Sequence, residues 1–277
     1  MKIEFIVKND NVRLSEELKS HLSRRLYKHI KGYKCEIYVN GNICETYKIV
    51  NKGDNVSVLY IKPNDIKWDL YESKLNIIYE DKHYLIVYKN KDLLTIPTKI
   101  NPKSLYQEVL YYLKSTNQEL NVSILNRLDK ETRGLVMVAK DTISASLMQP
   151  THEKMERRYL ALCHGIFDDK TGRIENRIRR SDDSNKRIIS DDGQIAITNY
   201  KVIKEYDNYS LVEFILETGR THQIRLHTSS INHPILGDKL YGIDDNIEDL
   251  KLLSYYIMYT DPYDSSSKIF NCENDLL

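Results

Sequence analysis

The segment SILNRLDKETRGLVMVAK, residues 123–140, places a carboxylate where it could do chemistry. Asp129 follows Arg127 by two residues and precedes Gly134 and an apolar run at 135–139 that is typical of a buried strand. A carboxylate near arginine side chains is expected to stay ionised at neutral pH, because nearby positive charge favours the anion. Asp129 could therefore act as a nucleophile rather than as a general acid. An aspartate before a strand is also a common turn-forming residue, so this segment alone allows both interpretations.

A second polar cluster lies in the segment LETGRTHQIRLHTSSINHPILGDKLYG. His222 and Arg225 are three residues apart and share one face of the short helix that the pattern predicts here, with Arg220 in the turn before it. Two further histidines follow, but no carboxylate or cysteine accompanies them at the spacing of a zinc motif. We therefore predict no metal site.

The elements that must position these residues are mainly strands. Strands are predicted for LNIIYE, HYLIVYK, RRYLALCHG, AITNYKVIKEY and YSLVEFILE, and an amphipathic helix for SLYQEVLYYLKS at 104–115. Strands outnumber helices and several are consecutive along the chain. This pattern favours an α+β fold built on a mixed, largely antiparallel sheet that is flanked by helices and loops.

The first sixty residues have a different pattern. Leucines and an isoleucine recur every four residues from Leu14 to Ile30, which predicts one or two short helices, and CEIYVNGNICETYKIVNKGDNVSVLYI then predicts short strands. The polar segment KPNDIKWDLYES follows and has few apolar residues in register. We predict a small α+β domain at 1–62, a linker at 63–74 and a larger domain at 75–277.

Four motifs, in this order and spacing, resemble the RluA family of RNA pseudouridine synthases: NRLDKETRGLVMVAK, ERRYLALCHG, DDGQIAITNYKVI and ETGRTHQIRLHTSSINHPILGDKLYG. The similarity runs from about Lys74 to the end of the chain. The N-terminal unit, through SRRLYKHI, EIYVNG and VNKGDNVSV, resembles the alpha-L type RNA-binding domain that precedes the catalytic domain in many members. The resemblance implies the pseudouridine synthase fold and an enzyme that isomerises uridine in structured RNA to pseudouridine.

The resemblance also implies roles for individual residues. Asp129 would be the catalytic carboxylate, and Tyr159 of the RRYLAL strand would pack on the target uracil. Arg225 would pair with Asp129 and keep it anionic, and Arg127 would stand beside the flipped-out nucleotide. These roles fit the chemistry, because a stacked base must be extruded before it can react and an aromatic ring recovers part of that cost. Without the resemblance, Tyr159 would be an ordinary half-buried strand aromatic.

The sequence leaves the course of the reaction open. Asp129 either adds to the sugar or stabilises positive charge at C1′, and the group that handles the C5 proton is not identified. Two departures from the family pattern stand near Asp129: Asn126 where most relatives have His, and Arg133 where they have Ser. Both concern substrate choice and binding more than chemistry, and Arg133 is either a phosphate contact or a solvated charge.

Basic residues are unevenly distributed although the net charge is only +1. They gather in residues 19–34 and 170–187, which is consistent with a face that follows phosphates and also with solvated surface charge. The residues that we predict to bind RNA are Arg127, Arg24, Arg25, Lys28, Arg133, Arg220, His222 and Arg187.

Several classes of protein are disfavoured. No run approaches the roughly 20 apolar residues of a membrane span, and the N-terminus does not resemble a signal peptide. The four cysteines are scattered, so reduced thiols and a cytoplasmic location are expected. The chain lacks a dinucleotide fingerprint, a Walker loop and a metal constellation, so no cofactor is predicted.

The expected partner is RNA, ribosomal rather than transfer, because alpha-L-like modules grip folded RNA by its shape and phosphates. We expect a monomer with no membrane contact. One alternative is a non-catalytic RNA-binding or ribosome-assembly protein that kept the fold, although it would have no need for Asp129, Tyr159 and Arg225 together. Another is a hydrolase that uses Asp129 with His222, although no second carboxylate or oxyanion motif accompanies them.

Overall fold

The computed structural model describes residues 2–22, 27, 35–60, 70–98, 103–118, 120–151, 155–184, 186–272 and 276. Three of the residues predicted to bind RNA, Arg24, Arg25 and Lys28, lie outside this part of the chain. So do residues 61–69, which hold most of the predicted linker. Of the helices in the described ranges, none is long and apolar enough to cross a membrane.

The described residues up to 60 form two small sheets and a helix. An antiparallel sheet has the order β1 (Lys2–Ile6), β6 (Asn55–Tyr60), β3 (Cys35–Val39) and β4 (Asn42–Ile43). A two-stranded sheet joins β2 (Val12–Arg13) to β5 (Ile49–Val50), and α1 spans Leu14–His21. Leu14, Leu18 and Leu22 of the predicted stripe are buried as expected, and its last two positions, 26 and 30, lie outside the described residues. The sequence pattern did not reveal β1.

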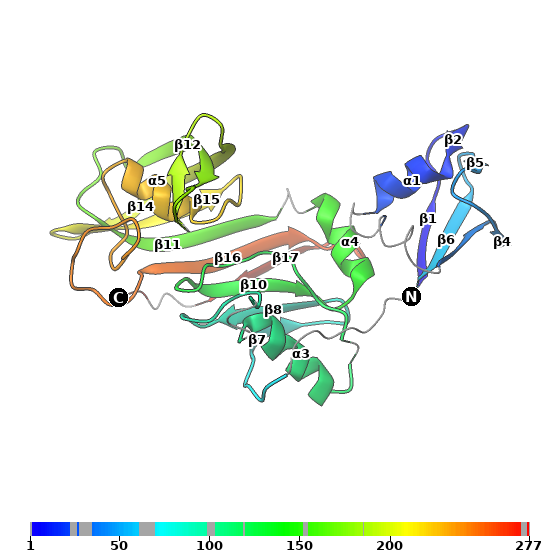
Figure 1. The fold of residues 1–277 in the computed structure, drawn as a ribbon, viewed down its shortest axis with the longest axis horizontal. Coiled ribbons are helices and arrows are strands. Elements are labelled where there is room, and N and C mark those ends of the chain that lie inside the picture. The colour runs from blue at the N-terminus through cyan, green and yellow to red at the C-terminus, as the bar shows by residue number, and fades with distance from the viewer. Residues whose placement is uncertain are drawn as a thin grey trace.

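This N-terminal unit has its own hydrophobic cluster, to which α1, β1, β3 and β6 contribute buried side chains. The partly buried Ile143 of α4 (Thr142–Thr151) packs against that cluster, and Figure 1 shows α4 beside the N-terminal unit. Leu70, which the sequence pattern places in the linker, instead packs against the core of the larger sheet. The part of the chain that packs with the larger sheet therefore includes residues before 75.

The larger sheet carries the rest of the described chain. Its strands have the order β13 (Arg187–Ile189), β12 (Thr171–Arg180), β14 (Gln194–Glu205), β15 (Tyr209–Leu216), β11 (Glu156–His164), β16 (Leu252–Thr260), β10 (Arg133–Ala139), β8 (Tyr84–Lys89) and β7 (Asn76–Glu80), with β9 (Ser123–Ile124) on β10 and β17 (Ser267–Asn271) on β16. The β10–β16 pair is parallel, and the other pairs of neighbouring strands named here are antiparallel. The predicted mixed, largely antiparallel sheet is confirmed.

Helices cover both faces of this sheet around β8 and β10. Along β8, Leu85 and Val87 share a cluster with α3 (Leu105–Ser115), while Tyr84 and Ile86 share another with Met148 of α4. Because successive strand residues point to opposite faces, burial of both faces explains the continuous apolar runs of β8 and β10. The third helix, α5 (Gln223–Ser230), lies beside β12 and β14 (Figure 1).

The contact between β10 and β16 requires a glycine. Gly134 pairs with Ser254 and has a φ of +118°. A Cβ at this position would lie 2.2 Å from the Ser254 carbonyl oxygen, so no other residue fits without a shift of backbone. This close approach brings the segment that holds Asp129 beside β16 and β11.

Candidate active site

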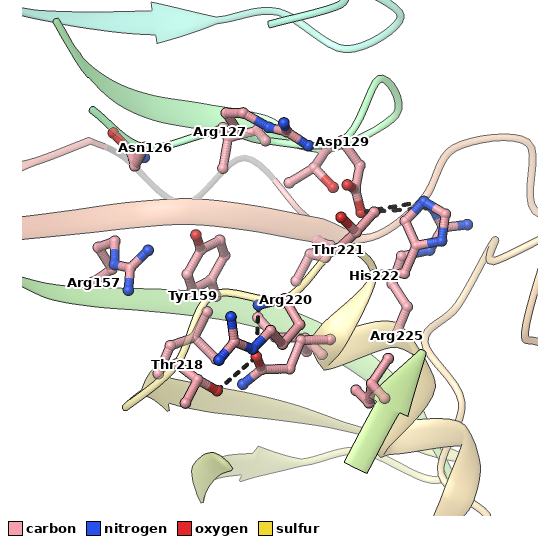
Figure 2. A pocket seen from close by; sticks show the side chains of 18 of the residues that line it. Asn126, Arg127, Asp129, Arg157, Tyr159, Thr218, Arg220, Thr221, His222 and Arg225 are labelled. Carbon is pink, nitrogen blue, oxygen red and sulfur yellow. Dashed lines mark hydrogen bonds and ion pairs between the residues drawn. The ribbon is translucent and has the colours of Figure 1, made fainter. Parts of the chain in front are cut away.

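A cavity of about 740 Å³ brings together the two polar segments that the sequence singled out. Its walls come from the Asp129 segment, from β11 and from the turn that leads into α5 (Figure 2). We call it the arginine-lined cavity, because its lining includes Arg127, Arg157, Arg187, Arg220 and Arg225. A second cavity of about 730 Å³ shares Asp129 and its neighbours as one wall.

Buried polar side chains fix the Asp129 segment from both ends. The Asn126 amide donates to the Leu135 carbonyl (3.2 Å) and accepts from the Met137 N–H (2.7 Å), so it pairs with β10 as a strand would. The Thr95 hydroxyl donates to the Leu128 carbonyl (2.6 Å) and accepts from its N–H (3.1 Å). The departure at Asn126 is thus a buried structural residue whose amide is engaged by backbone.

A buried lysine holds the far side of the same segment. Lys89 Nζ donates to the carbonyl oxygens of Asn90 (2.9 Å), Leu93 (2.7 Å) and Lys130 (3.1 Å). Burial lowers the pKa of Lys89 to about 8, although the negative charge of Asp129 opposes the shift. Lys89 therefore ties the residue after Asp129 to the end of β8.

The turn before α5 is held by one glutamine. Gln223 Oε1 accepts from the Thr218 hydroxyl (2.8 Å) and the Arg220 N–H (2.9 Å), and its Nε2 donates to the Ile197 carbonyl (2.9 Å). His222 stands at the helix N-terminus in the left-handed region, with a φ of +58°. This turn directs His222 and Arg225 toward Asp129, as Figure 2 shows.

Asp129 is partly buried, with 23% of its side chain exposed. Its Oδ2 lies 3.9 Å from His222 Nε2 and 4.0 Å from Arg225 Nη1. Burial raises the pKa of Asp129, although the positive charges of His222, Arg225 and Arg127 oppose the rise. The sequence led us to expect that nearby arginines would hold this pKa down. Burial prevails because His222 Nε2 and Arg225 Nη1 both stand beyond hydrogen-bond distance from the carboxylate.

Arg225 has a different principal partner. Its Nε and Nη2 lie 2.8 and 2.7 Å from the two carboxylate oxygens of Asp238, and both side chains are almost fully buried. Its Nη1 is 3.4 Å from Glu131 Oε2 and reaches Asp129 only at 4.0 Å. The implied pairing of Arg225 with Asp129 is therefore a near contact, and Asp238 is the residue that orients the guanidinium.

His222 has a defined hydrogen-bond environment. The Tyr241 hydroxyl oxygen accepts from the Arg187 N–H (2.6 Å) and lies 2.9 Å from His222 Nδ1. The hydroxyl proton is then available to His222 Nδ1, so the neutral imidazole carries its own proton on Nε2, which faces Asp129. Burial lowers the pKa of His222 and favours this neutral form.

The floor of the cavity comes from β11. Tyr159 is 5% exposed and lies with Arg157 on the same face of this strand, two residues apart (Figure 2). Sequence reasoning missed Arg157, although its alternation with Tyr159 was the available signal. It also missed Asp238 and Tyr241, whose roles depend on contacts that no local pattern encodes.

The structure brings most of the predicted site residues together. The arginine-lined cavity is lined by Arg127, Asp129, Tyr159, Arg187, Arg220, His222 and Arg225. Arg133 is absent from the linings of both described cavities and stands at the start of β10.

The chain matches a family model described as RNA pseudouridylate synthase over residues 83–230. It is 33% identical over 226 residues to an uncharacterized RNA pseudouridine synthase, YjbO, of Bacillus subtilis, covering 80% of each chain. It is 32% identical over 264 residues to an uncharacterized RNA pseudouridine synthase of Aquifex aeolicus, covering 91% of this chain and 84% of the relative.

Two further similarities concern a named enzyme and the fold. Ribosomal large subunit pseudouridine synthase D of Haemophilus influenzae is 34% identical over 197 residues, which are 69% of this chain and 60% of the relative. The structure of human RNA pseudouridylate synthase domain containing 1 superposes with a TM-score of 0.61 at 22% identity, covering 78% of this chain and 88% of that one. The chain therefore belongs to the RNA pseudouridylate synthase family, as an RluA-type enzyme that isomerises uridine in RNA.

Proposed function

We propose that Asp129 is the carboxylate that acts at C1′ of the target uridine and that Tyr159 lies beneath its uracil ring. The observation that carries this proposal is their common position in one cavity, with Asp129 on a wall and Tyr159 on the floor. An extruded base on Tyr159 gains about 1–3 kcal/mol from stacking, which offsets part of the cost of unstacking. The glycosidic carbon then meets the carboxylate.

Each neighbour of Asp129 has a part in this proposal. Arg225, held by Asp238, supplies fixed positive charge near the carboxylate without forming a close ion pair that would neutralise it. Neutral His222 presents its Nε2 proton to the same oxygen at 3.9 Å and can approach when substrate excludes water. Arg127 lines the cavity and is exposed to solvent, so it would stand beside the flipped-out nucleotide as it enters.

We further propose that the substrate is ribosomal RNA. A relative named as a ribosomal large subunit pseudouridine synthase supports this choice. The N-terminal unit would grip folded RNA through Arg24, Arg25 and Lys28, while Arg187 and Arg220 would contact the RNA at the cavity. Action as a monomer in the cytoplasm belongs to the same proposal.

The test compares ribosomal RNA from cells with and without the gene by pseudouridine-specific primer extension. We expect one or more pseudouridines to disappear and to return with the wild-type gene but not with Asp129→Asn. Full restoration by the Asp129→Asn variant would refute the catalytic assignment. Loss of a pseudouridine from transfer RNA alone would refute the ribosomal substrate while leaving the assignment of Asp129 intact.

A further inference from the structure

Arg157 is a buried arginine that has no partner in the described part of the chain. It is 9% exposed, and neither a hydrogen bond nor an ion pair joins its guanidinium to any residue that the structure describes. Its Nε is fully buried and finds no acceptor among the described residues. Arginine carries a permanent charge and five donors, so a buried guanidinium with no protein partner is expected to meet an acceptor from outside the chain.

The structure places this guanidinium inside the arginine-lined cavity. A Cβ on Gly219 would lie 3.0 Å from Arg157 Nη1, so the missing side chain at Gly219 leaves the room that the guanidinium occupies. The positive charge of Arg157 opposes the rise that burial causes in the pKa of Tyr159, which agrees with their nearness. In Figure 2, Tyr159 lies between Arg157 on one side and Asp129 on the other.

This order along the cavity predicts which part of the base Arg157 meets. If C1′ is at Asp129 and the ring lies on Tyr159, the edge opposite the glycosidic bond points toward Arg157. In uridine the bond is at N1, and the opposite ring atom is C4 with its carbonyl oxygen O4. In pseudouridine the bond is at C5, and the opposite ring atom is C2 with its carbonyl oxygen O2. The far edge therefore presents a carbonyl oxygen both before and after the uracil turns.

We propose that Arg157 is a specificity-determining residue that donates hydrogen bonds to the carbonyl oxygen at the far edge of the uracil. The proposal rests on the proposed positions of C1′ at Asp129 and of the ring on Tyr159. When the N1–C1′ bond breaks, its electron pair stays on the uracil and spreads to O2 and O4, so the guanidinium faces the developing negative charge. Cytosine carries an amino group at C4, which is a hydrogen-bond donor, and the guanidinium has no acceptor for it.

A phosphate is the competing ligand for an arginine in such a cavity. Phosphates belong to the continuous RNA backbone and remain near the mouth, where Arg127 and Arg220 are exposed. Arg157 lies beneath the turn at Gly219 and next to the floor residue Tyr159. Its depth therefore favours the base, which is the part of a flipped nucleotide that enters the cavity.

The test is a double-mutant cycle read from binding. Short RNAs centred on the mapped uridine carry uridine, cytidine or pyrimidin-2-one riboside, which lacks O4, at the target position. They are titrated against the full chain with Asp129→Asn, which is expected to prevent conversion, with and without Arg157→Met. We expect loss of O4 and loss of Arg157 each to weaken binding about tenfold, and the two losses together to weaken it no further. Preference for uridine over cytidine should fall by a similar factor.

The neighbouring arginine is the matched control. Arg158 lies on the opposite face of β11, pairs with Glu156 and Glu213, and lines neither described cavity. Arg158→Met should leave the preference for uridine unchanged. Thermal unfolding separates binding from structure, because Arg157→Met removes an unpaired buried charge and should not lower the melting temperature.

Three outcomes would overturn the proposal. Additive effects in the cycle would show that Arg157 does not contact O4. Equal weakening for all three RNAs, with a smaller salt dependence and rescue by Arg157→Lys, would assign Arg157 to a phosphate. A lower melting temperature with unchanged discrimination would make it structural. Because the cycle measures binding, a failure of Asp129 as the catalytic carboxylate would appear separately, as pseudouridine formed by the Asp129→Asn variant.

Discussion

Arg225 is joined to Asp238 by two short contacts of 2.7 and 2.8 Å, and it stands 4.0 Å from Asp129. The arginine that the family resemblance pairs with Asp129 is therefore oriented by a different carboxylate. Asp238 also accepts from the backbone N–H groups of Leu240 and Tyr241, and these bonds help to hold its pKa below the ordinary value despite burial. The turn at Asp238 thus controls the charge near Asp129.

Asp238→Asn should damage both stability and activity. Removing one partner of a buried pair costs about 3–5 kcal/mol, because the other charge is left uncompensated. The freed guanidinium can move toward Asp129, so the single-turnover rate should fall by about tenfold or more. Chemical denaturation and rapid-quench assays measure the two effects. Glu131→Gln is the control, because this exposed partner of Arg225 should contribute less than about 1 kcal/mol; equal effects of the two variants would contradict the assignment.

Asp129→Asn should abolish activity while stabilising the fold. If Asp129 is the catalytic carboxylate, as proposed, its loss should remove at least about 4 kcal/mol of transition-state stabilisation, which is roughly a thousandfold in rate. Because burial raises the pKa of Asp129, the ionised carboxylate costs folding free energy at neutral pH, and a neutral isostere removes that cost. The melting temperature of the variant should exceed that of the wild type at pH 7.

The difference in stability between the wild type and Asp129→Asn should depend on pH. The pKa of Asp129 is higher in the folded chain than in the unfolded chain. The protein therefore has its full stability below the pKa of the unfolded chain and loses part of it as pH rises through the pKa of the folded chain. The stability advantage of Asp129→Asn should therefore vanish in acid and grow as pH rises through the pKa of Asp129. Wild-type activity should rise over the same interval, since Asp129 is proposed to act as the anion. A melting-temperature difference that does not change with pH would contradict this account.

Lys89→Met tests the anchor beneath the segment that holds Asp129. Loss of the bond to the Lys130 carbonyl should misplace Asp129 and slow the single-turnover step by about tenfold or more. Burial lowers the pKa of Lys89 from 10.5 to about 8. The stability that wild type gains from an uncharged Lys89 is therefore complete above pH 10.5 and is lost as pH falls through 8. Relative to Lys89→Met, the wild type should gain up to about 1.4 kcal/mol per pH unit in that window. A constant difference in unfolding free energy between pH 8 and 10.5 would be evidence against a charged, buried Lys89.

Local sequence signatures predicted a large part of this site. Asp129, Tyr159 and Arg225 each belong to one of the motifs that resemble the family, and all three residues line one cavity. The strands β8 and β10 could also be predicted, because burial of both faces leaves an uninterrupted hydrophobic stretch in the sequence.

Long-range polar contacts were not predictable. Lys89 meets Lys130 across 41 residues and Asp238 meets Arg225 across 13, and no periodicity encodes such pairs. The sequence of β12 indicates only a basic stretch, because its buried hydrophobic residues are limited to Ile174 and Ile178. A charged strand at the side of a sheet lacks the hydrophobic alternation that identifies strands in sequence.

Tyr159 should contribute to RNA affinity through its aromatic ring. Tyr159→Phe keeps the stacking surface, so RNA affinity should stay within about twofold of wild type, whereas Tyr159→Ala should lose about 1–3 kcal/mol of binding. Fluorescence anisotropy with the Asp129→Asn background measures both without turnover. If Tyr159→Phe lost as much affinity as Tyr159→Ala, the hydroxyl would be the important group and the ring would not be a stacking platform.

The N-terminal unit should bind phosphates of the RNA backbone. Replacing Arg24, Arg25 and Lys28 with alanine should weaken RNA binding for all sequences alike, and the slope of log affinity against log salt should fall by about 0.9 for each phosphate that the variant no longer neutralises. Control substitutions at the exposed lysines Lys74, Lys82 and Lys114 remove the same charge from the larger unit. Since net charge alone would affect both triple variants equally, a lower slope only in the N-terminal variant would identify direct binding of phosphates. An unchanged slope there would remove the RNA-gripping role from the N-terminal unit and leave recognition to the arginines around the cavity.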